Sequence, residues 1–297
     1  MGLLDPLRSA AAVLPRPQPD LDVRGKVALV SGAGDGIGKE VARILHARGA
    51  HVAVLDRDAG AADRTAAGLE RAIALHADVR DRPAMTAAVG EVIERLGGLD
   101  VVVANAGIAP AAATLRQMEP EAFDAVIDIN LTGVFNTVHP ALDAIAASQG
   151  HVVVVASVAA FSPGPGGAAY MASKAGVEQL GRALRLELTP HGATAGTAYF
   201  GLVDTQMART MFDDDPLGRV VKRMFPLPLQ QRITPAQAAE VIAEGVRRRK
   251  ARTIAPEAWW GVMLTRGAGD LVFDRIAANT PVLRRIMASL EQRGPSA

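Results

Sequence analysis

The chain has 297 residues, of which 49% are hydrophobic and 21% charged, a composition typical of a folded globular protein rather than a disordered one. Lysine and arginine number 32 against 31 aspartates and glutamates, and the resulting net charge of +1 argues against a nucleic-acid partner. With no cysteine, 29 glycines and only 4% aromatic residues, the chain has no disulfides or thiolate metal sites, and its composition favours a layered α/β fold.

Residues 1–24 are expected to form an N-terminal segment and linker. Apolar residues recur at helical spacing from Leu3 to Leu14, and three prolines then end any helix. Asp5 and Pro6 interrupt the apolar core that an export signal requires, so we expect a cytoplasmic protein. Two interpretations of the segment stay open: a helix docked on its own domain, and a peripheral membrane contact. No apolar run is long enough for a transmembrane helix.

From Lys26 onward, short β-branched runs alternate with longer helical stretches, which is typical of a parallel sheet with right-handed crossovers. We therefore expect one doubly wound α/β domain of about seven strands over residues 25–255. Residues 202–233 lack clear periodicity and are expected to form a mobile lid, and residues 256–297 a C-terminal helical extension. The predicted strands are Val27–Val30, Val52–Leu55, Ile73–Ala77, Val101–Ala104, Val152–Ala156, Thr194–Phe200 and Thr253–Ile254.

A glycine-rich turn joins the first strand to the first helix through Gly32, Gly36, Ile37 and Gly38. Glycines allow the backbone to approach a pyrophosphate, and the helix N-terminus offers N–H groups to the anion. Asp56 follows 18 residues after Gly38, at the end of the second strand, where a dinucleotide site requires an acid for the ribose. The pattern predicts a Rossmann-type dinucleotide site.

Acidic residues near the ribose select the cofactor. Asp56 would repel a 2′-phosphate, and Asp35 adds to that bias, so NAD is preferred over NADP. Arg57 and Lys39 favour the opposite choice, which leaves NADP open. Asp78, followed by Val79 after the third strand, is either an adenine ligand or a solvated strand end.

Further motifs follow in order along the chain: Asn105-Ala106-Gly107 after the fourth strand, Asn130, Ser157, and Tyr170-Met171-Ala172-Ser173-Lys174. Ser157 precedes Tyr170 by 13 residues and Asn130 precedes Ser157 by 27. Over roughly residues 26–205 the sequence resembles the short-chain dehydrogenase/reductase family. The resemblance implies an NAD(P)-dependent oxidoreductase with a catalytic tetrad of Asn130, Ser157, Tyr170 and Lys174. It also implies that the protein assembles into homodimers or homotetramers.

The chemistry of an alcohol dehydrogenase explains these residue types. A phenol with an ordinary pKa of about 10 is a poor base at neutral pH unless its anion is stabilised. Lys174, four residues after Tyr170 on the same helix face, would lower the phenol's pKa together with the cationic nicotinamide. Ser157 would donate a hydrogen bond to the substrate oxygen. By resemblance, Asn130 interrupts its helix and holds a water that connects Lys174 to solvent.

Three departures from the family pattern lie outside the proton chemistry. Ser31 replaces the commoner threonine, Ala104 precedes Asn105 where two asparagines are usual, and Phe200 precedes Gly201 where proline is usual. Phe200 is expected to add an apolar wall beside the nicotinamide. By resemblance, the cofactor-binding residues beyond this strand are Gly201, Val203 and Thr205, and the last of these would bind the carboxamide.

The lid and the C-terminal extension are rich in apolar side chains. They favour a bulky apolar alcohol or ketone, although some of them would only pack the lid. The extension is expected to close the pocket, to bury a dimer surface or, through Trp259 and Trp260, to touch a lipid interface. The apolar residues are Met207, Met211, Phe212, Met224, Phe225, Leu227 and Leu229 in the lid, then Trp259, Trp260, Val262, Met263, Leu264, Val272, Phe273, Ile276, Leu283 and Ile286.

Two other functions stay open from the sequence. A 3-oxoacyl ketoreductase would share the whole constellation but would use NADPH and basic residues for a carrier phosphate. A non-catalytic dinucleotide-binding regulator would keep the glycine turn and Asp56 but would have no use for the tetrad. The sequence shows no metal-binding motif.

Overall fold

Seven parallel strands form the central sheet of the computed structural model, which describes residues 18–267, 269 and 281–292. The order β3-β2-β1-β4-β5-β6-β9 confirms the predicted doubly wound sheet, and each predicted strand lies within one residue of an observed one at either end. The strands are β1 Val27–Ser31, β2 His51–Asp56, β3 Ala72–His76, β4 Val101–Ala104, β5 His151–Val155, β6 Thr194–Phe200 and β9 Arg252–Ala255.

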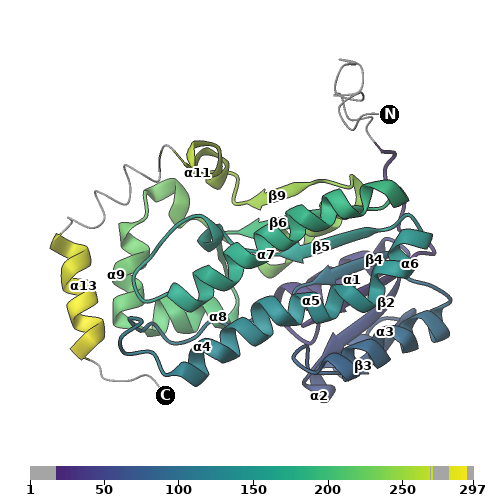
Figure 1. Ribbon diagram of the computed structural model, residues 1–297, viewed down its shortest axis with the longest axis horizontal. Helices are drawn as coiled ribbons and strands as arrows, with labels where there is room; N and C mark the ends of the chain where they lie inside the picture. Colours follow the sequence, from purple (N-terminus) through teal and green to yellow (C-terminus); the bar gives the residue numbers. More distant parts are fainter. Residues whose placement is uncertain (1–17, 268, 270–280, 293–297) are drawn as a thin grey trace, which may run out of the picture.

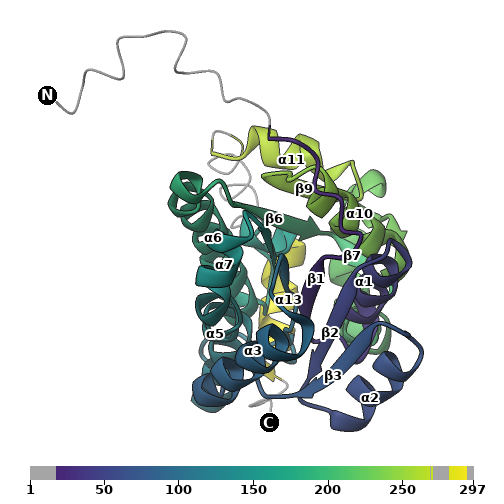
Figure 2. The same cartoon turned by 90° about the vertical axis from the view of Figure 1, so that its right-hand side faces the viewer.

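Helices cover both faces of the sheet, with α1, α2 and α10 on one side and α3, α5, α6 and α7 on the other (Figure 2). Successive strand residues point to opposite faces, so Leu29 and Leu55 join one core cluster while Val30 and Val54 join the other. The helices are α1 Gly36–Ala47, α2 Ala59–Ala67, α3 Arg82–Leu96, α4 Pro120–Ile127, α5 Gly133–Val138, α6 Leu142–Ala147, α7 Ala168–Glu187 and α10 Pro235–Arg247.

The lid, residues 202–233, is more regular than its sequence pattern predicted. It contains α8 Gln206–Arg209, a π-helical turn Thr210–Asp214, α9 Pro216–Met224 and a 3₁₀ turn Leu227–Gln230. Two short strands, β7 Leu202–Val203 and β8 Arg232–Ile233, pair in parallel and join its two ends. The sequence does contain a signal for α9, since Leu217, Val220, Val221 and Met224 recur at helical spacing. The other lid elements are too short to carry a readable periodicity.

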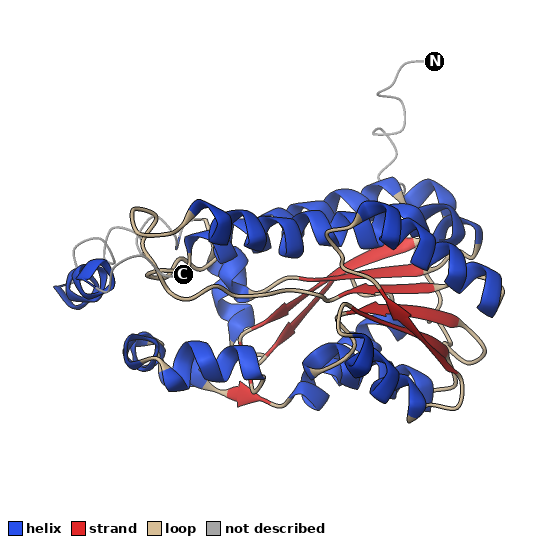
Figure 3. Cartoon of the chain, turned by 90° about the horizontal axis from the view of Figure 1, so that it is seen from below, coloured by secondary structure: helices blue, strands red, loops and turns tan. Residues whose placement is uncertain are grey.

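The C-terminal extension is divided between the core and the lid end of the molecule. In α11, Trp259–Thr265, the side chains of Trp259 and Met263 belong to the main hydrophobic core. Helix α13, Pro281–Gln292, lies with α8 and α9 at the end toward which the strand arrows point (Figure 1). Seen from below, the strands lie between two layers of helices, and further helices lie past the ends of the strands (Figure 3).

At the N-terminus the linker is tied to α10 from Asp20 onward. The N–H of Leu21 donates to the carbonyl of Arg247 (2.6 Å), Asp20 forms an ion pair with Arg247, and Leu21 and Val23 are buried. The amphipathic pattern from Leu3 to Leu14 lies outside the described residues, as do Val272, Phe273 and Ile276. Among the described helices, none is both long and apolar enough to cross a membrane.

Candidate active site

A cavity of about 510 Å³ runs along the carboxyl ends of β1 to β6 and extends under the lid. Buried parallel strands place their ends at one edge of a sheet, so residues distant in sequence meet there. Gly38 and Asn130 are the predicted site residues that do not line it. The predicted residues in its wall are Gly32, Asp35, Gly36, Ile37, Asp56, Arg57, Asp78, Val79, Asn105, Ala106, Gly107, Ser157, Tyr170, Lys174, Gly201, Val203 and Thr205.

The glycine turn brings backbone segments so close together that side chains would not fit between them. Gly32 has φ +63°, and a Cβ there would lie 2.8 Å from the Cα of Ala106. A Cβ on Gly38 would lie 2.2 Å from the carbonyl oxygen of Gly32. Helix α1 begins at Gly36, and its N-cap residue Asp35 makes no side-chain hydrogen bond to the first turn. The N-terminus of α1 therefore offers uncapped N–H groups to an anion in the cavity.

Asp56 lies at the end of β2, beside this turn. Its Oδ2 accepts a hydrogen bond from the N–H of Gly34 (2.9 Å) and its Oδ1 accepts one from the N–H of Asp58 (3.0 Å). These two bonds hold the carboxylate in the cavity wall next to Arg57. Its remaining lone pairs are suited to accept hydrogen bonds from ribose hydroxyls.

Asp78 lies at the cavity, but Arg80 already binds its carboxylate. The guanidinium of Arg80 reaches both carboxylate oxygens, with Nη2 at 2.6 Å from Oδ2 and Nε at 3.1 Å from Oδ1. Hydrogen bonding by the Arg80 side chain lowers the pKa of Asp78. A ligand at this carboxylate must therefore share it with Arg80, a partner that the sequence pattern had not indicated.

Asn105 and Ser31 join the end of β4 to the glycine turn. The Nδ2 of Asn105 donates to the carbonyl oxygens of Ser31 (3.0 Å) and Gly32 (3.1 Å). The hydroxyl of Ser31 accepts the N–H groups of Asn105 (3.1 Å) and Ala106 (3.3 Å). Serine in place of the usual threonine thus keeps the hydroxyl contact that shapes the turn.

Asn130 supports the site from behind its wall. It is buried in a π-helical turn, Asp128–Thr132, that interrupts the run from α4 to α5. Its Oδ1 accepts the N–H of Ile108 (2.8 Å), and its Nδ2 donates to the carbonyl of Ile108 (2.9 Å) and to Ser173 Oγ (3.1 Å). Ser173 in turn donates to the carbonyl of Tyr170 (2.7 Å), so Asn130 connects the Ile108 loop to α7.

Ser157, Tyr170 and Lys174 meet in the middle of the cavity. Helix α7 begins two residues before Tyr170 and places Lys174 one turn later. The Ser157 side chain lies close enough to Tyr170 to affect the pKa of the phenol, and the hydroxyl of Ser157 donates to the carbonyl of Phe200 (3.3 Å). Lys174 Nζ donates to the carbonyl of Val155 (2.9 Å) and lies 5.7 Å from the centroid of the Tyr170 ring.

Burial governs both titratable groups. Desolvation raises the pKa of the Tyr170 hydroxyl, and the side chain of Ser157 opposes this rise. Desolvation lowers the pKa of Lys174 to about 8. The lowered phenol pKa expected from the sequence is therefore not found for these side chains alone.

At the lid end of the cavity, Gly201 packs directly on Trp259, since a Cβ there would lie 2.4 Å from Trp259 Nε1. Phe200 is buried and lines the cavity, where it forms the expected apolar wall. Thr205 caps α8 through a hydrogen bond from the N–H of Ala208 (3.3 Å), which gives the start of the lid a defined geometry.

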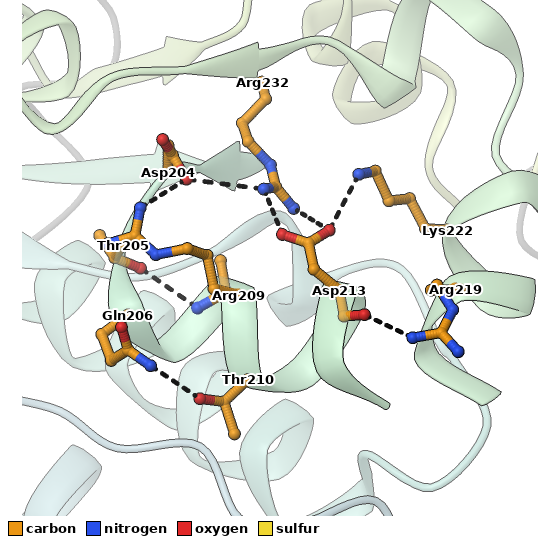
Figure 4. Close-up of polar contacts among 10 residues, drawn as sticks. Asp204, Thr205, Gln206, Arg209, Thr210, Asp213, Arg219, Lys222 and Arg232 are labelled. Atoms are coloured by element: carbon orange, nitrogen blue, oxygen red, sulfur yellow. Dashed lines mark hydrogen bonds and ion pairs between the residues drawn. The ribbon is translucent and has the colours of Figure 1, made fainter. Parts of the chain in front are cut away.

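An ion-pair network connects the lid to its β7–β8 base (Figure 4). Asp213 accepts two hydrogen bonds from Arg232, at 2.6 and 3.0 Å, and one from Lys222 at 3.2 Å. Arg232 also lies 3.5 Å from Asp204, which pairs with Arg209 at 2.9 Å. Hydrogen bonding to Arg232 lowers the pKa of Asp213 to about 2. The network joins the π-helical turn, α9 and β8.

Fold and cavity together define a dinucleotide-binding oxidoreductase of Rossmann type. The family profile described as short chain dehydrogenase matches residues 26–216. The chain belongs to the short-chain dehydrogenase/reductase family. Within the described residues, no group of three or more His, Asp or Glu side chains is placed to hold a metal ion.

Curated relatives include two enzymes named for cyclic alcohols. Trans-4-hydroxycyclohexanecarboxylate dehydrogenase of Sinomonas cyclohexanicum is 35% identical over 66% of this chain and 81% of its own length. (-)-Trans-carveol dehydrogenase of Rhodococcus erythropolis is 36% identical over 62% of this chain and 73% of its own length.

Solved structures with the same fold carry either cofactor. The 3-ketoacyl-(acyl-carrier-protein) reductase of Brucella melitensis, complexed with NADH, superposes with a TM-score of 0.70 at 27% identity, covering 78% of this chain and 97% of that one. A short chain dehydrogenase of Burkholderia cenocepacia in complex with NADP gives 0.69 at 32% identity, covering 76% and 92%.

Proposed function

We propose that the protein is an NAD-preferring oxidoreductase that interconverts a secondary alcohol and a ketone on a bulky apolar substrate. The observation that carries the proposal is that Ser157, Tyr170 and Lys174 meet in a cavity whose other end holds the glycine turn and Asp56. One cavity thus combines a cofactor cradle with a group that can exchange a proton.

The residues at the glycine turn fit a dinucleotide. The pyrophosphate would rest on the uncapped N-terminus of α1, against Gly36 and Ile37. Asp56 would accept hydrogen bonds from the adenosine ribose, and Thr205, with Gly201 and Val203, would hold the nicotinamide end. When bound, the nicotinamide supplies the chemistry of accepting or donating a hydride.

The protein's own side chains manage the proton. In ketone reduction, the Tyr170 hydroxyl donates its proton to the substrate oxygen, and in alcohol oxidation the phenolate takes it back. Ser157, which lines the same cavity beside Tyr170, would donate a hydrogen bond to the same oxygen. The ammonium of Lys174 would favour the phenolate, and Asn130 would fix α7 and its proton path.

Charge at the ribose end favours NAD. A 2′-phosphate beside Asp56 would place two negative charges in contact, whereas the ribose diol of NAD offers it hydrogen bonds. Arg57 also lines the cavity and is the residue that would favour NADP. Replacing Asp56 by Asn removes the charge but keeps an acceptor for the Gly34 N–H, so we expect the NAD-to-NADP affinity ratio to fall about tenfold or more. An unchanged ratio in a titration with both cofactors would assign the selectivity to other residues.

The substrate half of the cavity favours an apolar compound. Met207, Met211 and Phe212 from the lid line it, together with Phe225 and Trp259. Of the two relatives, one is named for carveol, an uncharged cyclic alcohol that agrees with this class, and the other for a cyclic alcohol that carries a carboxylate.

A screen tests the proposal directly. Hydrophobic secondary alcohols and ketones are offered to the purified protein with NAD(H) and, in parallel, with NADP(H), and nicotinamide absorbance is followed. Turnover of a cyclic alcohol with NAD is expected. Turnover confined to 3-oxoacyl thioesters with NADPH would favour the ketoreductase alternative, and cofactor binding without turnover of any compound would favour the regulator.

A further inference from the structure

The cavity is charged at one end and uncharged at the other. Its charged lining residues are Asp35, Asp56, Arg57 and Asp78 around the cofactor turn, and Lys174 at the centre. At the other end of the cavity, which is formed by the lid, α11 and α13, none of the described lining residues carries a formal charge. A carboxylate or phosphate in this half would lose its hydration without gaining an ionic partner.

Helix α13 forms part of this uncharged half. Ile286 and Leu290, one turn apart on the helix, line the cavity with exposures of only 4% and 2%. Leu290 packs on Gly166, where a Cβ would lie 3.0 Å from the Leu290 methyl group. Gly166 has φ +75° and its carbonyl accepts the N–H of Ala113 (3.1 Å), so the helix rests on two loops that both line the substrate half.

The last turn of α13 is anchored by polar contacts to residues far away in the sequence. The guanidinium of Arg116 reaches both oxygens of Glu291, with Nη2 at 2.5 Å from Oε2 and Nε at 3.2 Å from Oε1. Gln117 Nε2 donates to the carbonyl of Glu291 (3.0 Å). Both anchors come from the loop after β4 and bind Glu291, the residue next to Leu290.

We propose that α13 is the wall that sets the size and polarity of the substrate, with Ile286 and Leu290 as specificity-determining residues and the Arg116–Glu291 pair as a positioning element. The proposal rests on the proposed function and deepens it: the substrate is an uncharged alcohol or ketone whose apolar end, remote from the reacting carbon, contacts α13. The family match ends at residue 216, so this wall is supplied by the chain beyond it.

The same helix offers a matched control. Met287 is 38% exposed and is not part of the cavity wall, so Met287→Ala removes an apolar side chain from α13 without touching the site. If the helix only contributes stability, Leu290→Ala and Met287→Ala should lower the unfolding temperature and leave ligand affinity unchanged. If the helix forms the wall, Leu290→Ala should change ligand affinity by an amount that depends on the length of the ligand.

Binding is measured by calorimetry on the full chain saturated with NADH, a state in which alcohols cannot be oxidised. The probes are cyclohexanol, 4-tert-butylcyclohexanol and 4-cyclohexylcyclohexanol, which extend progressively from the same ring. We expect Leu290→Ala to weaken the longest probe about tenfold and cyclohexanol less than about twofold, with Met287→Ala changing neither. If the two variants change the affinity for every probe equally, the proposal that α13 forms the wall is wrong. If Leu290→Ala does not fold, Ile286→Val makes the same comparison at smaller scale.

Charge and positioning are tested in the same assay. 4-Hydroxycyclohexanecarboxylate differs from 4-tert-butylcyclohexanol in its ring substituent, and we expect it to bind at least about tenfold more weakly; equal affinity would overturn the uncharged class. Glu291→Arg should reduce discrimination by probe length, and the exchanged pair Arg116→Glu with Glu291→Arg should restore it. Failure of the exchange to restore discrimination would show that the pair does not position α13.

The two proposals fail in distinguishable ways. If Leu290→Ala changes probe binding as expected but the wild-type protein oxidises none of the probes, the proposed reaction is wrong and the proposal for α13 stands. If it oxidises them but the α13 variants bind every probe as wild type does, the reaction stands and the wall is wrong. If the protein binds no NADH, the probes are titrated without cofactor. The ratio of variant to wild-type affinity for each probe then still tests the role of α13.

Discussion

At the scale of single residues, burial of Tyr170 and Lys174 disfavours the charged forms that the proposed reaction requires. Burial raises the pKa of the phenol and lowers that of the ammonium to about 8. At neutral pH the phenol is therefore protonated, ready to act as an acid toward a ketone, while the lysine keeps its charge. Oxidation of an alcohol requires the phenolate, which the cationic form of the cofactor would favour.

The pKa of Lys174 leads to a stability prediction for the cofactor-free protein. Its folded-state value, about 8, is below the ordinary 10.5, so between these pH values the unfolded chain binds more protons and stability rises with pH. Burying the charge costs about 3 kcal/mol below pH 8, and the cost disappears as pH approaches 10.5. Lys174→Met should therefore gain most over wild type below pH 8, as measured by denaturant unfolding at several pH values. Parallel curves for the two proteins would show that the ammonium is solvated.

At the scale of elements, the lid has few buried residues of its own. It is held by ion pairs and by Phe225 and Leu229, which pack against the main hydrophobic core. Among the described lid residues, Gly218, Leu202, Val203 and Ile233 are buried, and all except Gly218 belong to its β7–β8 base. Asp213 joins the π-helical turn to both α9 and β8 through Lys222 and Arg232. Because so few lid side chains are buried, we expect the lid to be less stable than the sheet, and its ion pairs to contribute to its order.

Removing the central carboxylate should loosen the lid without unfolding the domain. We expect Asp213→Asn to raise KM for a bulky substrate several-fold and to leave NAD affinity and the melting temperature close to wild type. Asp214→Asn is the matched control, since the Asp214 side chain is exposed and next in sequence. A large fall in melting temperature for Asp213→Asn alone would mean that the network supports the whole fold.

The folded-state pKa of Asp213, about 2, adds a pH dependence. The stabilisation that its ion pairs provide is complete above the ordinary carboxylate pKa of 3.8 and is lost only as pH falls toward 2. Across the neutral range the lid network is therefore expected to stay intact.

Elements with local signals were predictable, and those that depend on distant contacts were not. The strands and the turn around Gly32 follow from β-branched runs and glycines, and Tyr170 and Lys174 follow from their spacing on one helix. The pairing of β7 with β8 involves two residues on each side, too few for a periodic pattern. Arg116 and Glu291 are 175 residues apart, and nothing in either local sequence indicates their contact.

At the scale of the whole molecule, the sheet provides a rigid frame and the additions to it provide the substrate half of the site. Residues after β1 to β5, with Tyr170 and Lys174 on α7, line the part of the cavity where we propose that the cofactor binds and the proton is transferred, while the lid, α11 and α13 line the other end. The homo-oligomeric assembly expected from the family stays a prediction. The division explains how one fold keeps its chemistry while its substrate changes.

The measurement that tests the central claim most directly is the turnover of Tyr170→Phe on a substrate found in the screen, with NAD affinity determined in parallel. The account predicts a fall of about 10²- to 10⁴-fold or more with NAD binding unchanged, because the ring stays and the proton-transfer group is removed. Tyr199→Phe is the control, since that tyrosine is buried in the core and outside the cavity. A Tyr170→Phe protein that keeps more than about a tenth of wild-type turnover would contradict the assignment of Tyr170 as the general acid and base.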